Sequence, residues 1–304
     1  MQRGTWGRAV PARLGLGCLP LGGGYGRVDP ARALRLVRHA LDSGAALLDA
    51  AEPDAGGEVL RLVGRAVAGR RDEAVITAHS RPLTAPAADA AATPAAACDR
   101  ALALLGVDHL DLFYLHPPGS PEPVEETVGA AAALVAAGKV GALGIAGVDA
   151  GQLVRAHAVH PLATVAVEYS LLDRGAERDL LPAARRLGLL VTAVRPLAGG
   201  LLAGRIAARA DLGPGDARLA DPRFSVERLA AVRELLTELQ STASRHDLGA
   251  ARLALAWLLS RGEDVLPLPG TRDRVHLEMN LSARRIELPA PARETLTALF
   301  APPS

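Results

Sequence analysis

The chain has 304 residues, of which 49% are hydrophobic and 22% charged, and its formal net charge at neutral pH is +1. This balance is typical of a soluble globular protein and excludes a largely disordered chain. No basic stripe and no run of about 18 uninterrupted apolar residues occurs, so neither nucleic acid nor a membrane is an expected partner.

Eight short apolar runs predict β-strands. A longer stretch follows each run and carries apolar residues three and four positions apart, an alternation typical of βα units around a parallel sheet. In chain order, the predicted strands are Leu14–Cys18, Ala46–Asp49, Ala74–Ala78, Leu110–His116, Ala142–Ala146, Thr164–Tyr169, Leu189–Val194 and Val265–Leu268.

The intervening stretches predict an outer ring of helices, and a further helix is expected near the C-terminus. We therefore expect one α/β domain over residues 1–304, a (β/α)8 TIM barrel with a C-terminal helical tail. The predicted helices are Ala31–Leu41, Glu58–Ala68, Pro94–Leu105, Val124–Ala137, Gly151–His157, Glu177–Leu187, Val226–Ser244, Ala250–Ser260 and Leu288–Phe300.

One connection is longer than the others. The segment Leu197–Arg223 exceeds an ordinary βα connection and predicts a functional loop over the mouth of the barrel. Catalytic groups in such barrels lie at the carboxyl ends of the strands, which directs attention to Asp49, His79 and His116.

Two cysteines, Cys18 and Cys98, lie far apart in the sequence and form no CxxC pair. Both are expected to be reduced thiols, because this pattern matches neither a secreted disulfide framework nor a structural zinc site. Without a recognisable signal sequence, we expect a cytoplasmic protein.

Several segments resemble the aldo-keto reductase superfamily. The resemblance covers nearly the whole chain and rests on Leu48-Asp49-Ala50-Ala51-Glu52, Leu110–His116, Val167–Arg174, Pro196–Arg205, and Pro269–Arg272 followed by Asn280. It implies the barrel fold and a reduction of carbonyl groups in which NADPH delivers hydride and a Tyr donates the proton. In the family, Asp, Lys and His accompany this Tyr, and the Lys paired with Asp lowers its pKa.

Only half of that tetrad is matched here. Asp49 and His116 fall where the family has its Asp and His, but the Tyr position holds Asp54 and the strand that normally ends in Lys ends in His79. An Asp is a base rather than a proton donor near neutrality. The only lysine in the chain is Lys139, so it is the only side chain that could supply an amine in place of the family's Lys.

The nicotinamide contacts of the family are also replaced. Ser-Asn at the end of the fifth strand reads Ala146-Gly147, the stacking Tyr of the seventh strand reads Val194, and the sixth-strand Gln corresponds to Ala166, or to Glu168 after a register shift of two. Small and aliphatic side chains neither hydrogen-bond nor stack on a nicotinamide ring. This end of the groove is expected to hold the ring poorly.

The phosphate end of the groove is better matched. Gly270, Thr271 and Arg272 resemble the loop that holds the adenosine 2′-phosphate, and Asn280 resembles the adenine contact, although Met279 stands where Glu is usual. An arginine beside a Gly-Thr turn at a helix start suits a phosphate. NADPH binding is therefore compatible with the sequence, although such turns are also common in barrels.

Two carboxylates and two imidazoles, Asp49, Asp54, His79 and His116, are the predicted catalytic set. Histidine changes charge near neutral pH, so this set suits general acid–base work. The alternative is that these side chains are merely solvated at the barrel mouth after loss of function. A metal bound by the two histidines and a carboxylate has no supporting ligand spacing, and no metal is expected.

Three further residues are predicted to contact a substrate. Arg195 follows Val194 and suits a carboxylate or phosphate, with a salt bridge at the rim as the alternative. Tyr25, inside a glycine run, suits a lid residue, with a surface turn as the alternative. Glu52 follows Asp49 in the same motif. The remaining histidines are expected to be structural or solvated: His39, His109, His157, His160, His246 and His276.

Three functions remain open at this point. The first is an enzyme without net redox change that needs no cofactor, such as a cyclase, dehydratase or isomerase of specialised metabolism acting on a small carbonyl or polyol. The second is an NADPH-dependent carbonyl reductase with an unconventional proton donor. The third is a non-catalytic ligand-binding or scaffold protein. The sequence predicts no oligomeric state.

Overall fold

A computed structural model of the chain describes residues 13–52, 56–80, 93–117 and 123–301. Eight parallel strands form one sheet in which each strand pairs with the next in the chain. The strands are β1 (Leu16–Gly17), β2 (Leu47–Asp49), β3 (Val75–His79), β4 (Leu110–Leu115), β5 (Val140–Ala146), β6 (Leu162–Glu168), β7 (Leu190–Val194) and β8 (Val265–Pro267).

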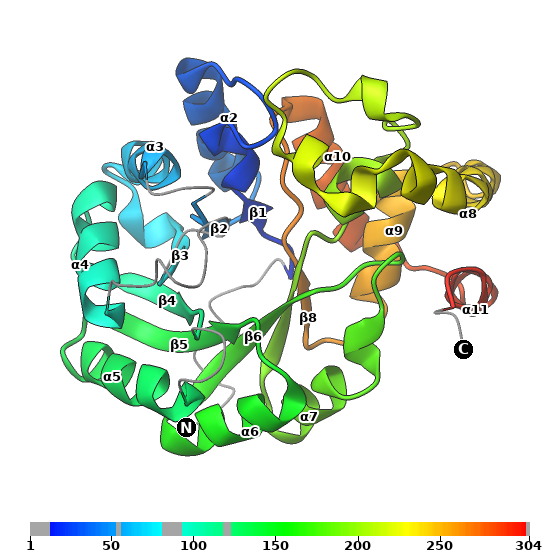
Figure 1. Cartoon of the computed structure of the whole chain (residues 1–304). Helices are drawn as coiled ribbons and strands as arrows, with labels where there is room; N and C mark the ends of the chain where they lie inside the picture. The colour runs from blue at the N-terminus through cyan, green and yellow to red at the C-terminus, as the bar shows by residue number, and fades with distance from the viewer. Residues whose placement is uncertain (1–12, 53–55, 81–92, 118–122, 302–304) are drawn as a thin grey trace.

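The sheet closes on itself between its first and last strands. The amides of Gly15 and Gly17 donate to the carbonyls of Pro267 and Pro269, each at 3.2 Å. Helices surround the strands (Figure 1). The predicted (β/α)8 barrel is therefore confirmed, with a ring of parallel strands buried on both faces.

The α-helices follow the predicted order with small shifts at their ends. Helix α10 was not predicted, and only Leu277, Asn280 and Leu281 are buried along it. The helices are α2 (Pro30–Asp42), α3 (Glu58–Val67), α4 (Pro94–Leu105), α5 (Val124–Ala136), α6 (Ala150–Val159), α7 (Leu180–Arg186), α8 (Val226–Arg245), α9 (Ala250–Leu259), α10 (Arg274–Ser282) and α11 (Ala290–Leu299).

The start of α2 illustrates how local sequence sets a helix. The carboxylate of Asp29 accepts the amide of Ala31 at 2.9 Å, and Pro30 occupies the first turn, where its missing N–H costs nothing. Leu36, Val37 and the other apolar residues on one side of α2 are buried against the barrel. Helix and cap together fix the loop between β1 and α2.

A layer of polar side chains lies inside the barrel below its mouth. The Tyr114 hydroxyl and the Thr192 hydroxyl are 2.7 Å apart, and Thr164 lies 2.9 Å from Thr192. Gly144 makes room for the Tyr114 ring, because a Cβ there would lie 2.7 Å from two ring atoms. The buried ring of Tyr114 therefore forms a fixed floor under the residues at the strand ends.

The predicted long loop after β7 consists of four 3-10 turns, η5 (Ala198–Ala203), η6 (Arg209–Asp211), η7 (Ala217–Ala220) and η8 (Pro222–Phe224). It contacts the loop before α2, where the Ala217 amide donates to the Gly24 carbonyl at 2.9 Å. The two loops lie side by side above the barrel (Figure 1, yellow-green and blue).

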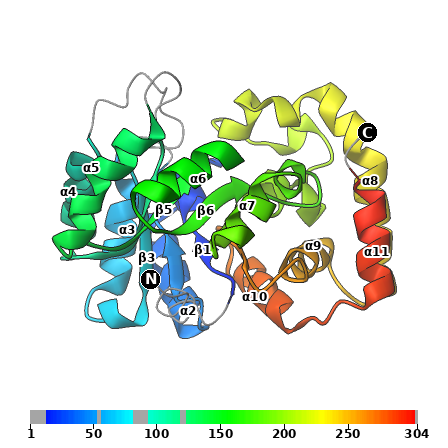
Figure 2. The same cartoon turned by 90° about the horizontal axis from the view of Figure 1, so that it is seen from below.

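The C-terminal helix α11 lies outside α9 at the edge of the molecule (Figure 2). The indole N–H of Trp257 in α9 donates to the Thr297 hydroxyl at 3.0 Å, which joins the two helices. Across the described ranges, no helix is long and apolar enough to cross a membrane. Cys18 and Cys98 are both free and buried.

Candidate active site

A cavity of about 1270 Å³ opens at the carboxyl ends of the strands. Its lining includes the last residues of several strands, among them Asp49 of β2, His79 of β3, Ala146 of β5 and Val194 of β7. The long loop after β7 and the start of α10 complete the wall. Ligand sites of α/β barrels lie at this face.

Asp49, His79 and His116 form a hydrogen-bonded chain in this cavity. Nε2 of His79 lies 2.8 Å from Oδ1 of Asp49, and Nδ1 of His79 lies 2.7 Å from Nε2 of His116. The Thr77 hydroxyl donates to the same Asp49 oxygen at 2.6 Å. The structure thus brings together three of the four predicted catalytic residues, and we call them the Asp–His–His chain.

The three members of the Asp–His–His chain differ in their exposure to solvent. The side chains of Asp49 and His79 are 8% and 5% exposed, whereas His116 is half-buried. The Tyr114 ring stacks on His79 with centroids 4.9 Å apart, which fixes the plane of that imidazole. His116 is therefore the member most open to a ligand, and Asp49 the buried anion that orients the others.

Asp54 and Lys139 are the other candidates for the roles of the family's Tyr and Lys. Asp54, predicted at the position of the family's Tyr, lies outside the described residues. Lys139 pairs with Asp99 at 2.5 Å and precedes β5, so it lies at the amino ends of the strands. The amine is thus on the opposite side of the barrel from the Asp–His–His chain.

The positions expected to hold the nicotinamide line the same cavity. Ala146, Gly147, Ala166 and Val194 all contribute to its wall, and Ala146 pairs with Ala166 in neighbouring strands. None of these side chains carries a hydrogen-bonding group. Glu168, the other register for the sixth strand, also lines the cavity and lies opposite Val194.

The predicted phosphate end also belongs to this cavity. Gly270, Thr271, Arg272 and Asn280 all line it. Arg272 donates to the Gly26 carbonyl at 3.3 Å. The Asn280 side chain is buried and, within the described part of the chain, makes no hydrogen bond. A buried amide that faces a cavity without a partner is a group that a ligand can satisfy.

Some residues of this end were missed by the sequence analysis. His276 was expected to be structural or solvated, but it lies in the first turn of α10 and lines the cavity. Arg205 in the loop after β7 lines it too. Their nearness to Gly270–Arg272 and to the Pro196–Arg205 segment was the available signal. His276 was missed because α10 itself was not predicted.

Tyr25 lines the cavity and is held in place by the loop after β7. The Arg218 guanidinium lies 4.3 Å from the centroid of the Tyr25 ring. The backbones of Tyr25 and Asp216 pair in an isolated antiparallel β-bridge. Burial raises the pKa of Tyr25, an effect that the charges of Arg195 and Arg218 oppose. Tyr25 is therefore part of the wall and not a surface turn.

Glu52 lies outside the lining of the cavity. Its side chain is buried, and Oε1 accepts the amide of Leu60 in the first turn of α3 at 2.8 Å. Amides at a helix start lack partners within the helix, so a carboxylate there is held by hydrogen bonding and by the helix dipole. The predicted substrate contact of Glu52 is replaced by a structural contact with α3.

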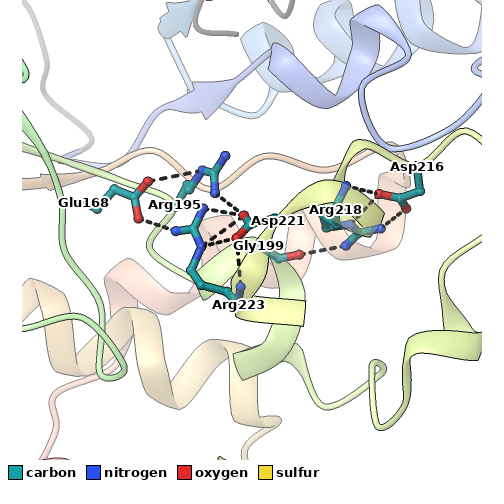
Figure 3. Close-up of polar contacts among 7 residues, drawn as sticks. All are labelled: Glu168, Arg195, Gly199, Asp216, Arg218, Asp221 and Arg223. Carbon is teal, nitrogen blue, oxygen red and sulfur yellow. Dashed lines mark hydrogen bonds and ion pairs between the residues drawn. The ribbon is translucent and has the colours of Figure 1, made fainter. Parts of the chain in front are cut away.

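Arg195 reaches neighbouring acids, which corresponds to the salt bridge weighed as an alternative. Its Nη1 lies 3.0 Å from Oδ2 of Asp221, and its Nε lies 3.5 Å from Oε1 of Glu168. Arg223 pairs with the same two acids (Figure 3). Burial raises the pKa of both Glu168 and Asp221, and the charge of Arg195 opposes the shift.

The two histidines and Asp49 were also weighed as metal ligands. Within the described ranges, no group of three or more His, Cys, Asp and Glu side chains is arranged to hold a metal ion. In the Asp–His–His chain, the ring nitrogens face each other and Asp49 at hydrogen-bonding distance.

Comparisons with known proteins show the family and the fold of this chain. Residues 13–299 match the Aldo/keto reductase family. A probable aldo-keto reductase 1 of Glycine max is 31% identical over 297 residues, which cover 95% of this chain and 85% of the relative. The aldo-keto reductase str7 of Strobilurus tenacellus is 39% identical over 194 residues, or 63% of this chain and 58% of the relative.

Solved structures of the same kind superpose on the barrel. An aldo/keto reductase from Klebsiella pneumoniae, solved with NADP and acetate, has a TM-score of 0.75 and 30% identity, with 97% of this chain and 93% of the other covered. A glycerol dehydrogenase from Gluconobacter oxydans has a TM-score of 0.80 and 25% identity, with coverages of 95% and 91%.

The fold and the strand-end cavity are thus those of an α/β barrel with a candidate ligand site at the carboxyl ends of its strands. This chain belongs to the aldo-keto reductase family.

Proposed function

We propose that this protein is an NADP(H)-dependent carbonyl reductase in which His116, oriented through His79 and Asp49, donates the proton that a tyrosine donates in the family. The supporting observation is that the Asp–His–His chain and the Gly270–Asn280 end line one continuous cavity. The Klebsiella pneumoniae relative, solved with NADP, supports the choice of cofactor.

The residues present fit the phosphate and adenine parts of the cofactor. Arg272 supplies a guanidinium for the 2′-phosphate, Thr271 a hydroxyl, and Asn280 a buried amide without a protein partner. When bound there, the cofactor supplies the hydride for carbonyl reduction. The remaining chemistry belongs to the side chains of this chain.

The Asp–His–His chain can deliver one proton to a substrate, and a proton taken up from solvent then restores the starting state of the site. A proton leaves a ring nitrogen of His116 for the carbonyl oxygen, and Nδ1 of His79 then returns one to Nε2 of His116 across their 2.7 Å contact. The Asp49 carboxylate stabilises the positive charge on His79 while both protons are present. The Thr77 hydrogen bond keeps that carboxylate in place.

A second candidate is acid–base catalysis without net redox change, such as dehydration, isomerisation or cyclisation. It is favoured by the cavity wall at Ala146, Gly147, Ala166 and Val194, which offers a nicotinamide ring no side-chain hydrogen bond and no stacking face. The same Asp–His–His chain would then both remove and return protons on one substrate.

The two candidates differ in what happens to NADPH. We expect the purified protein to bind NADPH, seen as a change in its fluorescence, and to oxidise it when aldehydes and ketones are added. Arg272→Met should weaken NADPH binding by about 10-fold or more, because a charge-assisted contact to a phosphate is lost. Conversion of a carbonyl substrate at the same rate with and without NADPH would reject the reductase in favour of the second candidate.

A further inference from the structure

Two arginines and two acids form a compact cluster beside the cavity. Arg195 directly follows β7 and Arg223 lies in η8. Both contact Glu168, at the end of β6, and Asp221 (Figure 3). Glu168 and Arg195 line the cavity wall. The backbone of Arg195 has φ of +49°, a conformation that L-residues rarely adopt, so the turn after β7 sets the direction of this side chain.

The two acids play different parts in this cluster. Asp221 is the more buried, at 15% side-chain exposure, and it accepts from Nη1 of Arg195 at 3.0 Å and from Nε of Arg223 at 2.9 Å. It also accepts from Nη2 of Arg223 at 2.5 Å and from the Arg223 amide at 3.0 Å. Asp221 therefore holds the guanidinium groups of Arg195 and Arg223 close together.

Glu168 is the outer acid, at 39% side-chain exposure. One of its oxygens faces Arg195 and the other faces Arg223, so a single carboxylate bridges two guanidinium groups. That is the geometry in which arginines bind a carboxylate or phosphate of a ligand. Burial of Glu168 raises its pKa and Asp173 and Asp221 add to the effect, so the bridging anion is held at some electrostatic cost.

We propose that Arg195 and Arg223 form a two-arginine fork that binds an oxyanion of the ligand in place of the Glu168 carboxylate. Glu168 is the internal occupant of the fork, and its exposed side chain turns toward solvent when the ligand enters. The oxyanion is either a carboxylate on the substrate or a phosphate of the cofactor. This inference rests on the proposed function in one respect, because Arg195 and the Glu168 carboxylate line the same cavity as the Asp–His–His chain.

Binding of two probes to the wild-type protein and to charge variants tests the fork. The probes are NADPH and 4-oxopentanoate, the latter beside its methyl ester, and isothermal titration calorimetry gives their dissociation constants. The variants are Arg195→Met, Arg223→Met, the conservative Arg195→Lys, and Glu168→Gln. Arg178→Met is the matched control, because Arg178 is 88% exposed and pairs only with Asp179 among the described residues. Thermal melts by circular dichroism verify that each variant is folded.

We expect Arg195→Met and Arg223→Met each to weaken one probe by about 10-fold or more, as for loss of a charge-assisted hydrogen bond. Arg195→Lys should retain part of the affinity, and Glu168→Gln should tighten binding because the competing anion is gone. Weaker NADPH binding identifies the cofactor phosphate. A substrate carboxylate is identified if the two methionine variants bind 4-oxopentanoate more weakly and its methyl ester binds poorly to the wild type and to every variant.

The fork is overturned if both methionine variants bind both probes within twofold of the wild type, or if the folded wild type binds neither probe. Failure of the proposed function looks different. In that case, the wild type binds 4-oxopentanoate through the fork but never oxidises NADPH. Conversely, NADPH oxidation that survives in Arg195→Met and Arg223→Met with unchanged affinities removes the fork and leaves the proposed reductase intact.

Discussion

At the scale of single residues, the family resemblance predicts that Asp54 and His79 take the positions of the Tyr and the Lys. The Asp49 carboxylate, which in the family faces a lysine, here meets Nε2 of His79 at 2.8 Å. A histidine both donates and accepts at neutral pH, so two in series can pass a proton where a phenol needs a cation to lower its pKa. The stacked Tyr114 ring keeps His79 in the required plane.

The Asp–His–His chain should behave as one unit in kinetics. His116→Gln is expected to lower kcat for carbonyl reduction by about 10²-fold to 10⁴-fold, the usual contribution of a general acid. His79→Gln should lower it strongly as well, and the double variant should be little worse than His116→Gln, because residues of one relay are not additive. Steady-state rates at saturating NADPH measure this.

NADPH affinity should stay within twofold in these variants, since neither histidine lies at the phosphate end. A His116→Gln protein that retains more than half of the wild-type kcat would exclude His116 as the proton donor.

Residue types in the sequence were sufficient to identify Asp49, His79 and His116 as a set, because each falls at the end of a predicted strand. Sequence could not give their order of contact, since that depends on which ring nitrogen faces which neighbour. It also placed Glu52 with the substrate, whereas the structure uses that carboxylate at the start of α3. Side-chain direction within a loop is decided by contacts distant in the chain.

At the scale of elements, the C-terminal helix depends on one buried arginine. Nη1 of Arg174 donates to the carbonyls of Thr297 and Phe300 at 2.6 and 3.2 Å, and Nη2 donates to Glu177 at 2.8 Å. Carbonyls in the last turn of a helix have no partner within the helix. The Arg174 side chain, at 8% exposure, therefore fastens the end of α11 to the loop after β6.

Arg174→Met should destabilise the protein by about 2–3 kcal/mol, because it leaves Glu177 and the α11 carbonyls without their buried partner. Urea denaturation gives the free energy of unfolding, and hydrogen exchange over residues 290–299 should report faster local opening. The exposed pair of Arg178 and Asp179 is the control, for which Arg178→Met should cost less than about 1 kcal/mol. Equal losses in the two variants would contradict this role of Arg174.

At this scale, all eight strands and every α-helix except α10 were predictable from the sequence. Each predicted strand overlaps an observed strand, because a buried parallel strand is a continuous apolar run whatever its neighbours. Helix α10 was missed because its apolar residues alternate with polar ones instead of recurring at three- and four-residue spacing: Val275, Leu277, Met279 and Leu281. Its capping residue Asp273, which accepts the amides of Val275 and His276, was the available local signal.

At the scale of the whole molecule, one cavity joins residues from both halves of the chain. The Asp–His–His chain comes from β2, β3 and the end of β4, whereas Arg272, His276 and Asn280 come from the segment after β8. Closure of the barrel between β1 and β8 brings these distant segments around one opening.

Cofactor binding should therefore stabilise the entire barrel. NADPH at 100 times its dissociation constant should add about 2.7 kcal/mol to the free energy of unfolding by mass action. At equal concentration, NADH should raise the melting temperature less, because it lacks the phosphate expected to contact Arg272. In Arg272→Met, this difference between the cofactors should disappear. Equal melting temperatures of the wild type with NADPH and with NADH would contradict the assignment of Arg272.

By itself, the sequence determined the barrel, its family and the residue types at the strand ends, because buried strands, amphipathic helices and strand-end motifs are local patterns. Only the tertiary structure decided which side chains touch. In the structure, His79 lies between Asp49 and His116, and the Glu52 carboxylate accepts an amide of α3. Arg195 pairs with Glu168 and Asp221. These contacts join residues that are distant in the chain, and their geometry is set by how the strands and loops pack around a shared cavity.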